Sequence, residues 1–359
     1  MTWRKAVELF HFIESYEKLG SAALGPGQAE LMTLLKQRMI EVIQLIDTKG
    51  GLMDYGSLQE CHVFHAPFYE PAQEVRNVKS IKTITTVHDL IPVMLPDLFV
   101  GINDVDYQRM LKSLEALTPD DYIICVSQAT KTDLINRSNL DPEKVFVTYE
   151  AADPAMFFPV ADPLRIQEVC SRYGISKAPY FLSVCTLEPR KNLDRVIEAF
   201  SKVIHESNDP DLQLVLVGSL GWKYERIFEV LNQWKVGRDR VILPGYVADE
   251  DLAPLYSQAL GFVYVSLYEG FGLPPLEAMQ CGTPTITSNV SSLPEVVGDA
   301  ALLVDPKDTN AIAAAMLQLY QDSHFREQLS QRGVARSRQF TWQRCVDETM
   351  AAYQTMMQS

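Results

Sequence analysis

Short apolar segments alternate with helical stretches along most of this chain, and this alternation limits the folds that it can adopt. The sequence predicts four strands before residue 153 and six after residue 159, at 62–65, 82–87, 122–126, 144–149, 180–184, 212–217, 240–243, 261–265, 283–287 and 301–304. Short buried strands separated by helices are typical of parallel sheets with helices on both faces. We therefore predict an α/β chain with two such sheets, and we interpret the segment 153–159 as the linker between them.

Glu269 and Glu277 stand at the two ends of a glycine-rich turn. The turn follows the strand predicted at 261–265 and precedes a predicted helix, which has prolines in its first turn and stops at Gly282 and Pro284. A strand, a glycine turn and a helix N-terminus in this order present backbone N–H groups and the positive end of a helix dipole to an anion. Carboxylates beside an anion site suit a ligand that also carries hydroxyl groups. The segment therefore favours a nucleotide-sugar as the ligand.

Glu269, seven intervening residues and Glu277 resemble the E-x7-E signature of the retaining glycosyltransferases of the GT-B fold, family 4. Other segments are similar to this family and follow its order along the chain. They are the basic loop at 186–192, a strand and turn at 214–219, a base-binding turn at 244–249 and a late signature at 293–306. Together these motifs are far more specific than a single glycine turn.

The resemblance implies an architecture of two Rossmann-like domains that face a central cleft. In this chain they would be an N-terminal acceptor-side domain at 1–158 and a C-terminal nucleotide-sugar-binding domain at 159–340. The final helix, at 341–359, would pack back on the first domain.

The first 50 residues depart from the family pattern, which usually begins with a strand and a glycine-rich loop. Residues 3–16 and 30–46 instead carry apolar side chains at helical spacing, and we expect them to form packing helices. The glycine-rich segment 20–27 between them is either a plain linker or a remnant of the family's loop. The mixed charges of the second helix favour packing over a membrane-surface role.

Arg190 and Lys191 follow a predicted strand and precede a helix predicted at 193–205. Cations beside a helix N-terminus can neutralise the charge that develops on a leaving diphosphate. Two adjacent basic residues are often only surface charges, but the sequence Glu-Pro-Arg-Lys-Asn around them favours a catalytic role. Many relatives carry glycine and arginine where this chain has Cys185 and Thr186, so Arg190 and Lys191 would supply the charge here.

The resemblance also assigns the other donor contacts. Glu277, expected in the first turn of its helix, is similar to the glutamate that binds the ribose hydroxyls, and Glu269 to the one near the donor sugar. Val247 lies in the turn whose backbone would read the base. The remaining donor-binding candidates are Thr186, Gly218, Gly270, Phe271, Gly272 and Leu273, the last three of which would offer backbone N–H groups to phosphate or sugar oxygens.

Two histidines of the N-terminal half lie at predicted strand ends, which line the ligand crevice of open α/β sheets. His88 is similar to a family histidine near the donor sugar, and we predict a catalytic position for it, with Asp89 as an orienting or capping residue. His65 is a candidate on the acceptor side, and a purely structural role is equally compatible with its sequence.

The family mechanism would retain the configuration of the sugar by a same-face reaction. The acceptor hydroxyl attacks as the diphosphate leaves, and a phosphate oxygen takes the proton, unlike the paired carboxylates of glycosidases. The sequence contains no cluster of histidine, cysteine and carboxylate at metal-ligand spacing. We therefore expect no cofactor and no metal.

Composition excludes several other classes of protein. The net charge of −14 argues against nucleic-acid binding. No apolar run is long enough to span a membrane, and the N-terminus lacks the features of a secretory signal. The six cysteines form no C-x-x-C pair and are typical of reduced thiols. We expect a cytoplasmic protein, with peripheral contact at the inner face of the membrane left open. Dehydrogenases and P-loop NTPases are disfavoured because their glycine motifs are absent.

The forms E-P-R-K-N and H-D-L resemble bacterial mannosyl- or related hexosyltransferases of surface polysaccharide assembly. We predict a retaining hexosyltransferase that moves a hexose, with mannose favoured, from a nucleotide-diphosphate sugar such as GDP-mannose to a glycan or lipid-linked acceptor. One alternative is a GT-B nucleotide-sugar epimerase, which would change the sugar without an acceptor. Another is a catalytically silent GT-B protein that acts as a binding partner. The donor sugar and its base, the acceptor, the linkage and the oligomeric state stay open at this stage.

Overall fold

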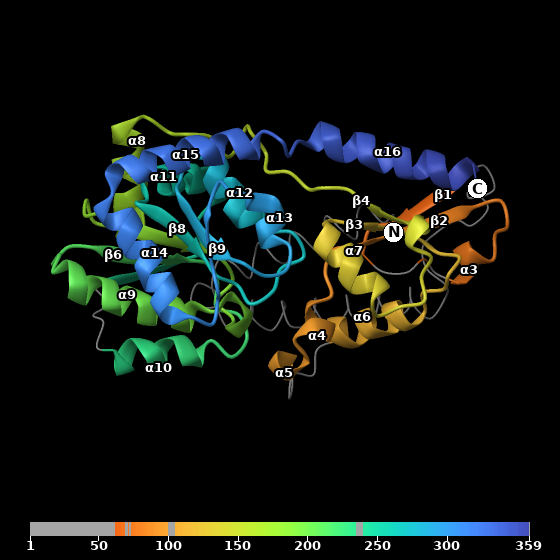
Figure 1. Cartoon of the computed structure of the whole chain (residues 1–359), viewed down its shortest axis with the longest axis horizontal. Coiled ribbons are helices and arrows are strands. Elements are labelled where there is room, and N and C mark those ends of the chain that lie inside the picture. The colour runs from red at the N-terminus through yellow and green to blue at the C-terminus, as the bar shows by residue number, and fades with distance from the viewer. Residues whose placement is uncertain (1–61, 69–70, 72, 100–104, 235–239, 359) are drawn as a thin grey trace, which may run out of the picture. The chain divides into compact units, whose positions relative to one another are not determined.

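Figure 1 shows the computed structural model of the chain, which describes residues 62–68, 71, 73–99, 105–234 and 240–358. The helices predicted at 3–16 and 30–46 lie outside these residues. Val63–Arg76 and Lys82–Ser359 form one unit by their internal contacts. Both sheets and the candidate site lie within this unit.

The first sheet contains four parallel strands in the order β1-β2-β3-β4. Its strands are β1 (Val63–Ala66), β2 (Lys82–Val87), β3 (Tyr122–Cys125) and β4 (Val145–Val147), and its helices are α3 (Gln73–Arg76), α4 (Ile91–Met94), α5 (Pro96–Phe99), α6 (Val105–Glu115) and α7 (Gln128–Ile135). The four strands predicted for this half of the chain are therefore present, with only small shifts at their ends.

The second sheet contains six parallel strands in the order β10-β9-β8-β5-β6-β7. The chain runs outward from β5 to β7 on one side and then from β8 to β10 on the other, which is the doubly wound order of a Rossmann sheet. Its strands are β5 (Tyr180–Val184), β6 (Gln213–Val217), β7 (Val241–Gly245), β8 (Gly261–Tyr264), β9 (Thr285–Ser288) and β10 (Leu302–Val304). Because the order reverses between β5 and β8, the carboxyl ends of these two strands mark the expected ligand crevice.

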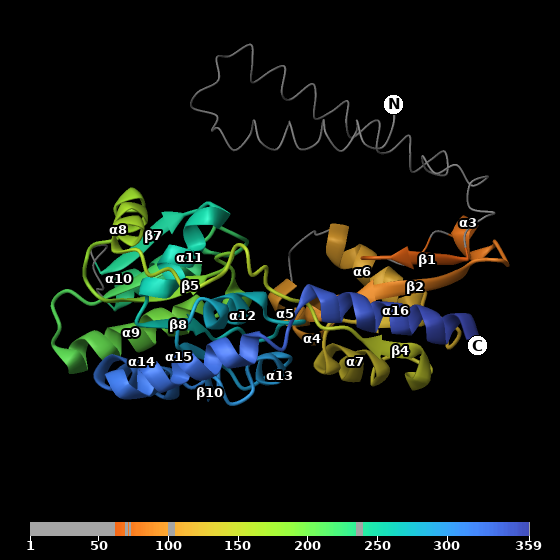
Figure 2. The same ribbon diagram turned by 90° about the horizontal axis from the view of Figure 1, so that it is seen from above.

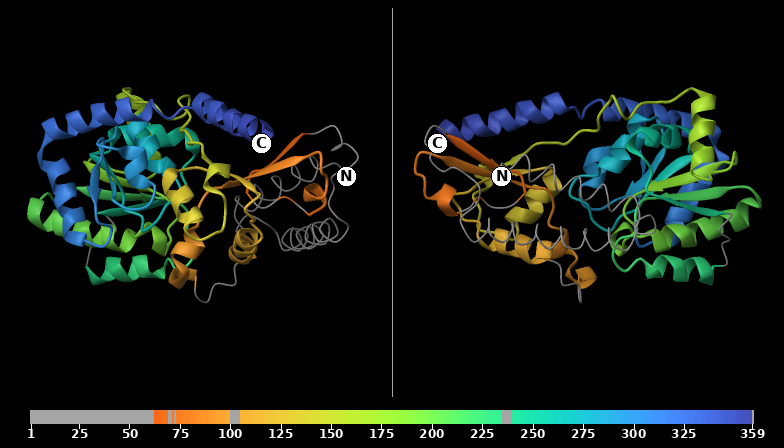
Figure 3. Two further views of the ribbon diagram at one scale, coloured as in Figure 1. Left: turned by 45° about the vertical axis from the view of Figure 1, so that its right-hand side comes forward. Right: turned by 180° about the vertical axis from the view of Figure 1, so that it is seen from behind.

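Helices cover both faces of the second sheet (Figures 1 and 3). They are α8 (Pro163–Arg172), α9 (Leu193–Ser207), α10 (Glu225–Gln233), α11 (Asp249–Gln258), α12 (Leu273–Gln280), α13 (Leu293–Val297), α14 (Thr309–Gln321) and α15 (Ser323–Ser337). Alternate residues of β5 enter opposite cores, Tyr180 and Leu182 on one face and Phe181 on the other. The first core includes side chains of α8, α11 and α12, and the second those of α9, α10 and α14. The loops at the strand ends therefore start from well-packed supports.

The C-terminal helix α16 (Trp342–Gln358) packs on the first sheet (Figure 2). Ala352 and Met356 are buried together with Ile84 of β2 and Ile124 of β3. The Lys82 ammonium also donates a hydrogen bond of 2.7 Å to the Met356 carbonyl. The chain thus returns to its first sheet after completing the second.

The helix after the glycine turn differs from its prediction in one respect. α12 starts at Leu273, and Glu277 is its fifth residue, so this carboxylate lies in the second turn rather than the first. Gly272, directly before the helix, has φ +119°, a conformation that side chains rarely adopt. This glycine allows the helix to start earlier than the two prolines suggested.

Candidate functional site

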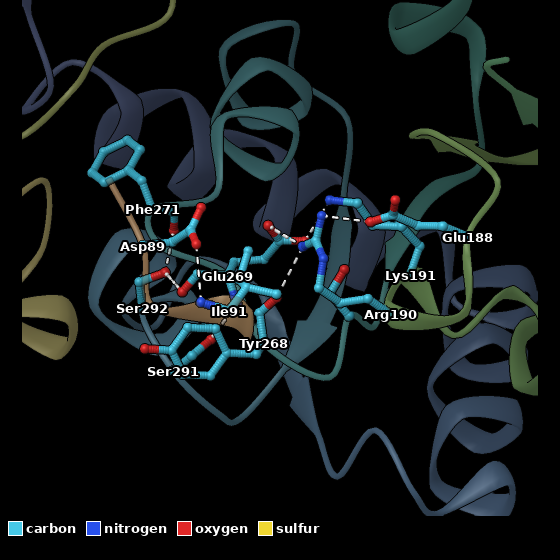
Figure 4. Close-up of polar contacts among 12 residues, drawn as sticks. Asp89, Ile91, Glu188, Arg190, Lys191, Tyr268, Glu269, Phe271, Ser291 and Ser292 are labelled. Atoms are coloured by element: carbon cyan, nitrogen blue, oxygen red, sulfur yellow. Dashed lines mark hydrogen bonds and ion pairs between the residues drawn. The ribbon is translucent and has the colours of Figure 1, made fainter. Parts of the chain in front are cut away.

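The charged groups of the candidate site lie at the carboxyl ends of β5 and β8, where the strand order reverses. Arg190 and Lys191 lie in the loop after β5, and Glu269 lies in the loop after β8 (Figure 4). Lys191 and Glu269 are 78 residues apart in the sequence, yet their charged atoms are in contact. The sheet topology is what brings these residues together.

Glu269 is a buried carboxylate whose two oxygens both have partners. Lys191 Nζ lies 2.6 Å from Glu269 Oε1, and Arg190 Nη1 lies 2.7 Å from Oε2. The Tyr264 hydroxyl donates a further hydrogen bond of 2.7 Å to Oε1. The Lys191 and Arg190 side chains are themselves only 10% and 13% exposed. The structure therefore joins the two predicted cations and the first glutamate of the signature in one buried cluster.

The loop that carries the two cations is anchored at both ends of its short 3-10 turn. Glu188 pairs with Arg190 Nη2 at 2.7 Å, so this guanidinium lies between two carboxylates. Asn192 has φ +62° and donates hydrogen bonds from its amide to the carbonyls of Val265 and Pro306, at 3.0 and 2.7 Å. These contacts explain why the motif ends in asparagine and fix the direction of its basic side chains.

Electrostatics keeps this cluster charged. Burial alone would raise the pKa of Glu269, but Lys191 and Arg190 bring this pKa down to about 2. Burial also opposes charge on Arg190, yet the carboxylates of Glu269 and Glu188 raise the pKa of its guanidinium above the usual value. A carboxylate with this pKa and with both oxygens paired is a weak base and a weak nucleophile.

The glycine turn after Glu269 is fixed by two serines (Figure 4). The Ser292 hydroxyl is 3.0 Å from the Glu269 carbonyl and 2.6 Å from the Phe271 carbonyl, and the Glu269 N–H donates to the Ser291 hydroxyl at 3.0 Å. The Phe271 side chain is buried, with its ring 5.8 Å from that of Phe340. The predicted donor-binding role of Phe271 can therefore involve only its backbone.

The N-terminus of α12 has no side-chain cap. The residue before the helix is Gly272, which has no side chain that could cap it. Pro274 and Pro275 have no N–H group, so the donors at this end come from residues before them. This arrangement is consistent with the predicted anion contact at Phe271 to Leu273, which remains a prediction.

Gly270 lies directly against the backbone that follows β2. A Cβ atom on Gly270 would overlap the carbonyl of His88 and come within 2.8 Å of the Asp89 Cβ. The Thr130 hydroxyl at α7 donates a 3.1 Å hydrogen bond to the Gly270 carbonyl. Asp89 accepts a hydrogen bond of 2.9 Å from the N–H of Ile91, the first residue of α4, whose N-cap residue is Leu90. The structure thus brings His88 and the glycine turn together.

Both ring nitrogens of His88 have acceptor partners. Nε2 lies 2.9 Å from the Pro67 carbonyl, and Nδ1 lies 3.3 Å from Glu150. The hydrogen bond to Glu150 raises the pKa of His88, against the opposing effect of burial. The ring of Phe68 stacks on the imidazole at 5.0 Å. These contacts favour a protonated, fixed imidazole at this position.

His65 lies inside β1, one residue before the end of the strand. Its Nδ1 is 2.6 Å from the Tyr353 hydroxyl of α16, and its Nε2 is 2.7 Å from the Thr86 hydroxyl. Burial lowers the pKa of His65, and the nearby His88 adds to this effect. These two hydrogen bonds favour a structural role, which joins α16 to the sheet, over the predicted acceptor contact.

Glu277 is a second, differently held carboxylate. The Tyr256 hydroxyl donates to Glu277 Oε2 at 2.9 Å, and no basic residue pairs with this carboxylate among the described residues. Burial raises its pKa to about 7, and the charge of Asp249 contributes in the same direction. The two glutamates of the signature therefore differ sharply in protonation.

The remaining donor-binding candidates lie around the ends of β5, β6 and β7. Thr186 is exposed at the start of the loop after β5. Gly218 has φ +141° and donates from its N–H to the Gly245 carbonyl at 2.9 Å, and a Cβ there would overlap the Cys185 carbonyl. Gly218 therefore allows the close approach of two strand ends. Val247 follows β7, and its side chain is buried.

Two pockets lie near His88 and the glycine turn. One, of about 240 Å³, includes Val87, His88 and Asp89 together with apolar residues of α6. The other, of about 730 Å³, is lined by Gln128 and Asp133 on α7 and by further residues that include Tyr268, Ser291 and Glu295. Both pockets therefore adjoin residues that contact the glycine turn or lie beside it.

Several members of the cluster were not predicted from the sequence. Tyr264 and Tyr256 donate to the two signature glutamates, and Glu188 flanks Arg190. Tyr264 ends strand β8, and a polar side chain at the carboxyl end of a central strand was the available signal. Tyr256 lies within α11 and gave no comparable signal.

The described part of the chain contains neither a metal-binding cluster nor a helix suited to cross a membrane. No group of three or more histidine, cysteine, aspartate or glutamate side chains in this part of the chain could hold a metal ion. None of the helices that the structure describes has both the length and the apolar character needed to cross a membrane.

Comparison with known protein families and with individual relatives points to the same class of enzyme, the glycosyl transferases. The family described as "Glycosyl transferases group 1" matches residues 170–336. An "O-antigen chain mannosyltransferase B" from Escherichia coli is 34% identical over 363 residues, which cover 98% of this chain and 91% of that protein. These relatives support a transferase and give no support to the epimerase alternative.

Solved structures show the same fold. Sucrose-phosphate synthase from Thermosynechococcus elongatus has a TM-score of 0.69 at 24% identity, with 85% of this chain and 77% of that chain covered. Anabaena Alr3699/HepE, crystallised with UDP and glucose, has a TM-score of 0.65 at 18% identity, with 85% and 81% covered. These similarities confirm two Rossmann-like α/β domains of the GT-B type.

Proposed function

This chain belongs to the group 1 glycosyl transferases, and we propose that it moves mannose from GDP-mannose to a glycan or lipid-linked acceptor. The mannosyltransferase from Escherichia coli supports mannose as the sugar, since its similarity extends over nearly all of both chains. The observation that carries the proposal is the buried cluster of Lys191, Arg190 and Glu269 at the switch point of the second sheet. Two cations at this position suit a donor with a diphosphate leaving group.

We assign the donor contacts according to the charges of the site. Arg190 and Lys191 neutralise the leaving diphosphate, together with the N–H groups at Gly272 and Leu273. Glu269 holds both cations in place and accepts from hydroxyls of the donor sugar. Glu277, which has only Tyr256 as a described partner, accepts from the ribose hydroxyls.

The state of Glu269 supports a same-face reaction with retention of configuration. Both of its oxygens are paired, and its pKa is about 2, so it is a poor nucleophile for a covalent intermediate. In the proposed step, the acceptor oxygen bonds to the anomeric carbon as the bond from that carbon to the diphosphate oxygen breaks. The acceptor proton passes to a phosphate oxygen of the leaving group. We propose that this reaction takes place in the cytoplasm without a metal ion.

Calorimetry with GDP, UDP, ADP and dTDP is the direct test of the donor. We expect the tightest binding with GDP, and transfer of radiolabelled mannose from GDP-mannose to a glycan acceptor by the same preparation. Failure of all four nucleotides to bind would reject the proposal. Conversion of the nucleotide-sugar to an epimer without any acceptor would instead revive the alternative reaction.

A further inference from the structure

A second buried carboxylate lies just beyond the turn that contains Val247. Asp251 is the third residue of α11, and its side chain is fully buried. Arg165 Nη2 lies 2.6 Å from its Oδ1, and Arg172 Nη1 lies 2.7 Å from its Oδ2. Both arginines belong to α8, so Asp251 joins α8 to the first turn of α11.

The hydroxyl of Tyr173, the residue directly after α8, extends this cluster to the backbone of the turn. It donates a hydrogen bond of 2.9 Å to Asp251 Oδ2 and accepts one of 3.2 Å from the Ala248 N–H. Ala248 is the residue before α11 and has no side chain that could cap the helix. The Tyr173 hydroxyl therefore has a fixed direction, because Asp251 can only accept its proton and Ala248 can only donate to it.

Val247, directly before Ala248, is the residue of this turn whose backbone is predicted to read the base. In the part of the chain that the structure describes, no hydrogen bond joins the Val247 N–H or C=O to another residue. The residue nevertheless is only 2% exposed and follows β7 at the carboxyl edge of the sheet. A buried backbone donor and acceptor without protein partners are costly unless a ligand or water satisfies them. A nucleobase edge, which offers donors and acceptors side by side, would do so.

We propose that Tyr173 is a positioning residue for base recognition: held by Asp251, its hydroxyl fixes the turn at Ala248 so that the Val247 backbone meets the nucleobase. This inference rests on the proposed function, because it requires a nucleotide donor. The two arginines hold Asp251 in turn, so α8 acts as a support behind the base pocket. Hydrogen-bonded recognition depends on donors held at fixed positions, which such a support provides.

The test compares two tyrosine hydroxyls that bond to aspartates in the same domain. Tyr173→Phe removes the hydroxyl at the turn. The matched control is Tyr320→Phe, because the Tyr320 hydroxyl donates a hydrogen bond of 2.8 Å to Asp209. Asp209 precedes β6 and so lies at the amino ends of the strands, away from the turn at their carboxyl ends. Binding of GDP, UDP and ribose 5-diphosphate, which lacks a base, is measured by calorimetry for the wild type and both variants.

We expect Tyr173→Phe to weaken GDP binding about tenfold, as the loss of one well-placed hydrogen bond would. It should also narrow the preference for GDP over UDP and leave binding of ribose 5-diphosphate unchanged, whereas Tyr320→Phe should change none of these. An equal loss with GDP and with ribose 5-diphosphate would overturn the inference, since it would reveal a general structural effect. Unchanged GDP binding and base preference in Tyr173→Phe would overturn it as well. If the wild type bound no nucleotide, the proposed function itself would fail.

Discussion

Two buried carboxylates of the second sheet's domain are built alike but lie in different places. Glu269 and Asp251 are each held by two cations and one tyrosine hydroxyl. The cations around Glu269 are 13% and 10% exposed, whereas those around Asp251 are 33% and 46% exposed. In the first cluster all the charges are buried, and in the second only the carboxylate is.

From this difference we infer that the first cluster is a ligand site and the second an anchor. Cations that are buried beside one carboxylate at the carboxyl edge of a sheet are stabilised further by an incoming anion. Cations that reach water gain little from one, because solvent already stabilises their charge. The composition of a charged cluster therefore says less about its function than the burial of each partner and its place in the sheet.

The largest expected effect is on stability, and it distinguishes the two clusters. Glu269→Gln leaves two buried cations without their carboxylate and should lower the free energy of unfolding by about 3–5 kcal/mol. Asp251→Asn should cost less, because its arginines remain partly hydrated. Thermal unfolding with and without GDP measures both effects.

GDP provides the control in that experiment. Because the diphosphate can replace the lost charge, saturating GDP should raise the melting temperature of Glu269→Gln at least as much as that of the wild type. It should stabilise Asp251→Asn less than the wild type. The comparison between the clusters would break down if GDP raised the melting temperature of Asp251→Asn to that of the wild type but did not raise that of Glu269→Gln.

The next effect is on the rate of transfer. Arg190→Ala or Lys191→Ala removes charge that matters most as the diphosphate leaves, and each should lower turnover about 100- to 1,000-fold. Lys202→Ala is the control, because Lys202 forms an ion pair with Glu198 within α9 and is 34% exposed. Steady-state kinetics with the nucleotide-sugar would reject the catalytic assignment if both site variants kept turnover close to that of the control.

The smallest effect concerns pH and Glu277. Because burial raises the pKa of Glu277 to about 7, its carboxylate is mostly protonated below this pH and mostly ionised above it. Only the ionised form accepts from both ribose hydroxyls, so GDP binding should weaken as pH falls below 7, by up to about tenfold per pH unit. The ratio of wild-type to Glu277→Gln affinity cancels the titration of the phosphate itself. A ratio that stays constant from pH 6 to pH 8 would contradict the assignment.

The sequence was sufficient for much of this fold because buried parallel strands are short, apolar and separated by helices. The motifs next to strand ends also singled out Arg190, Lys191 and Glu269, which the structure joins in one buried cluster. The sequence did not predict their pairing, since contacts between residues 78 positions apart depend on the strand order. Glu277 lies one residue further into its helix than predicted, because the conformation of Gly272 is not visible in the sequence.

The residues that support the site were the hardest to predict. Tyr256, Tyr173 and Asp251 lie in helices or directly after them, where polar residues are usually solvated. Their partners belong to other elements, and only the packing of α8 against α11 and of α11 near α12 reveals them. The same holds for His65, whose partners on α16 and β2 decide its role.

The return of α16 to the first sheet has a consequence for how the protein is made. A ribosome completes strands β1 to β4 early, and domains generally fold in the order in which they emerge. Here, however, the side chains that cover Ile84 and Ile124 come from Ala352 and Met356, which are synthesised only after all the strands of the second sheet. The second sheet can finish its core during translation, while the first must wait with one apolar face uncovered. Of the two sheets, the one that is translated first is therefore the one whose core is completed last.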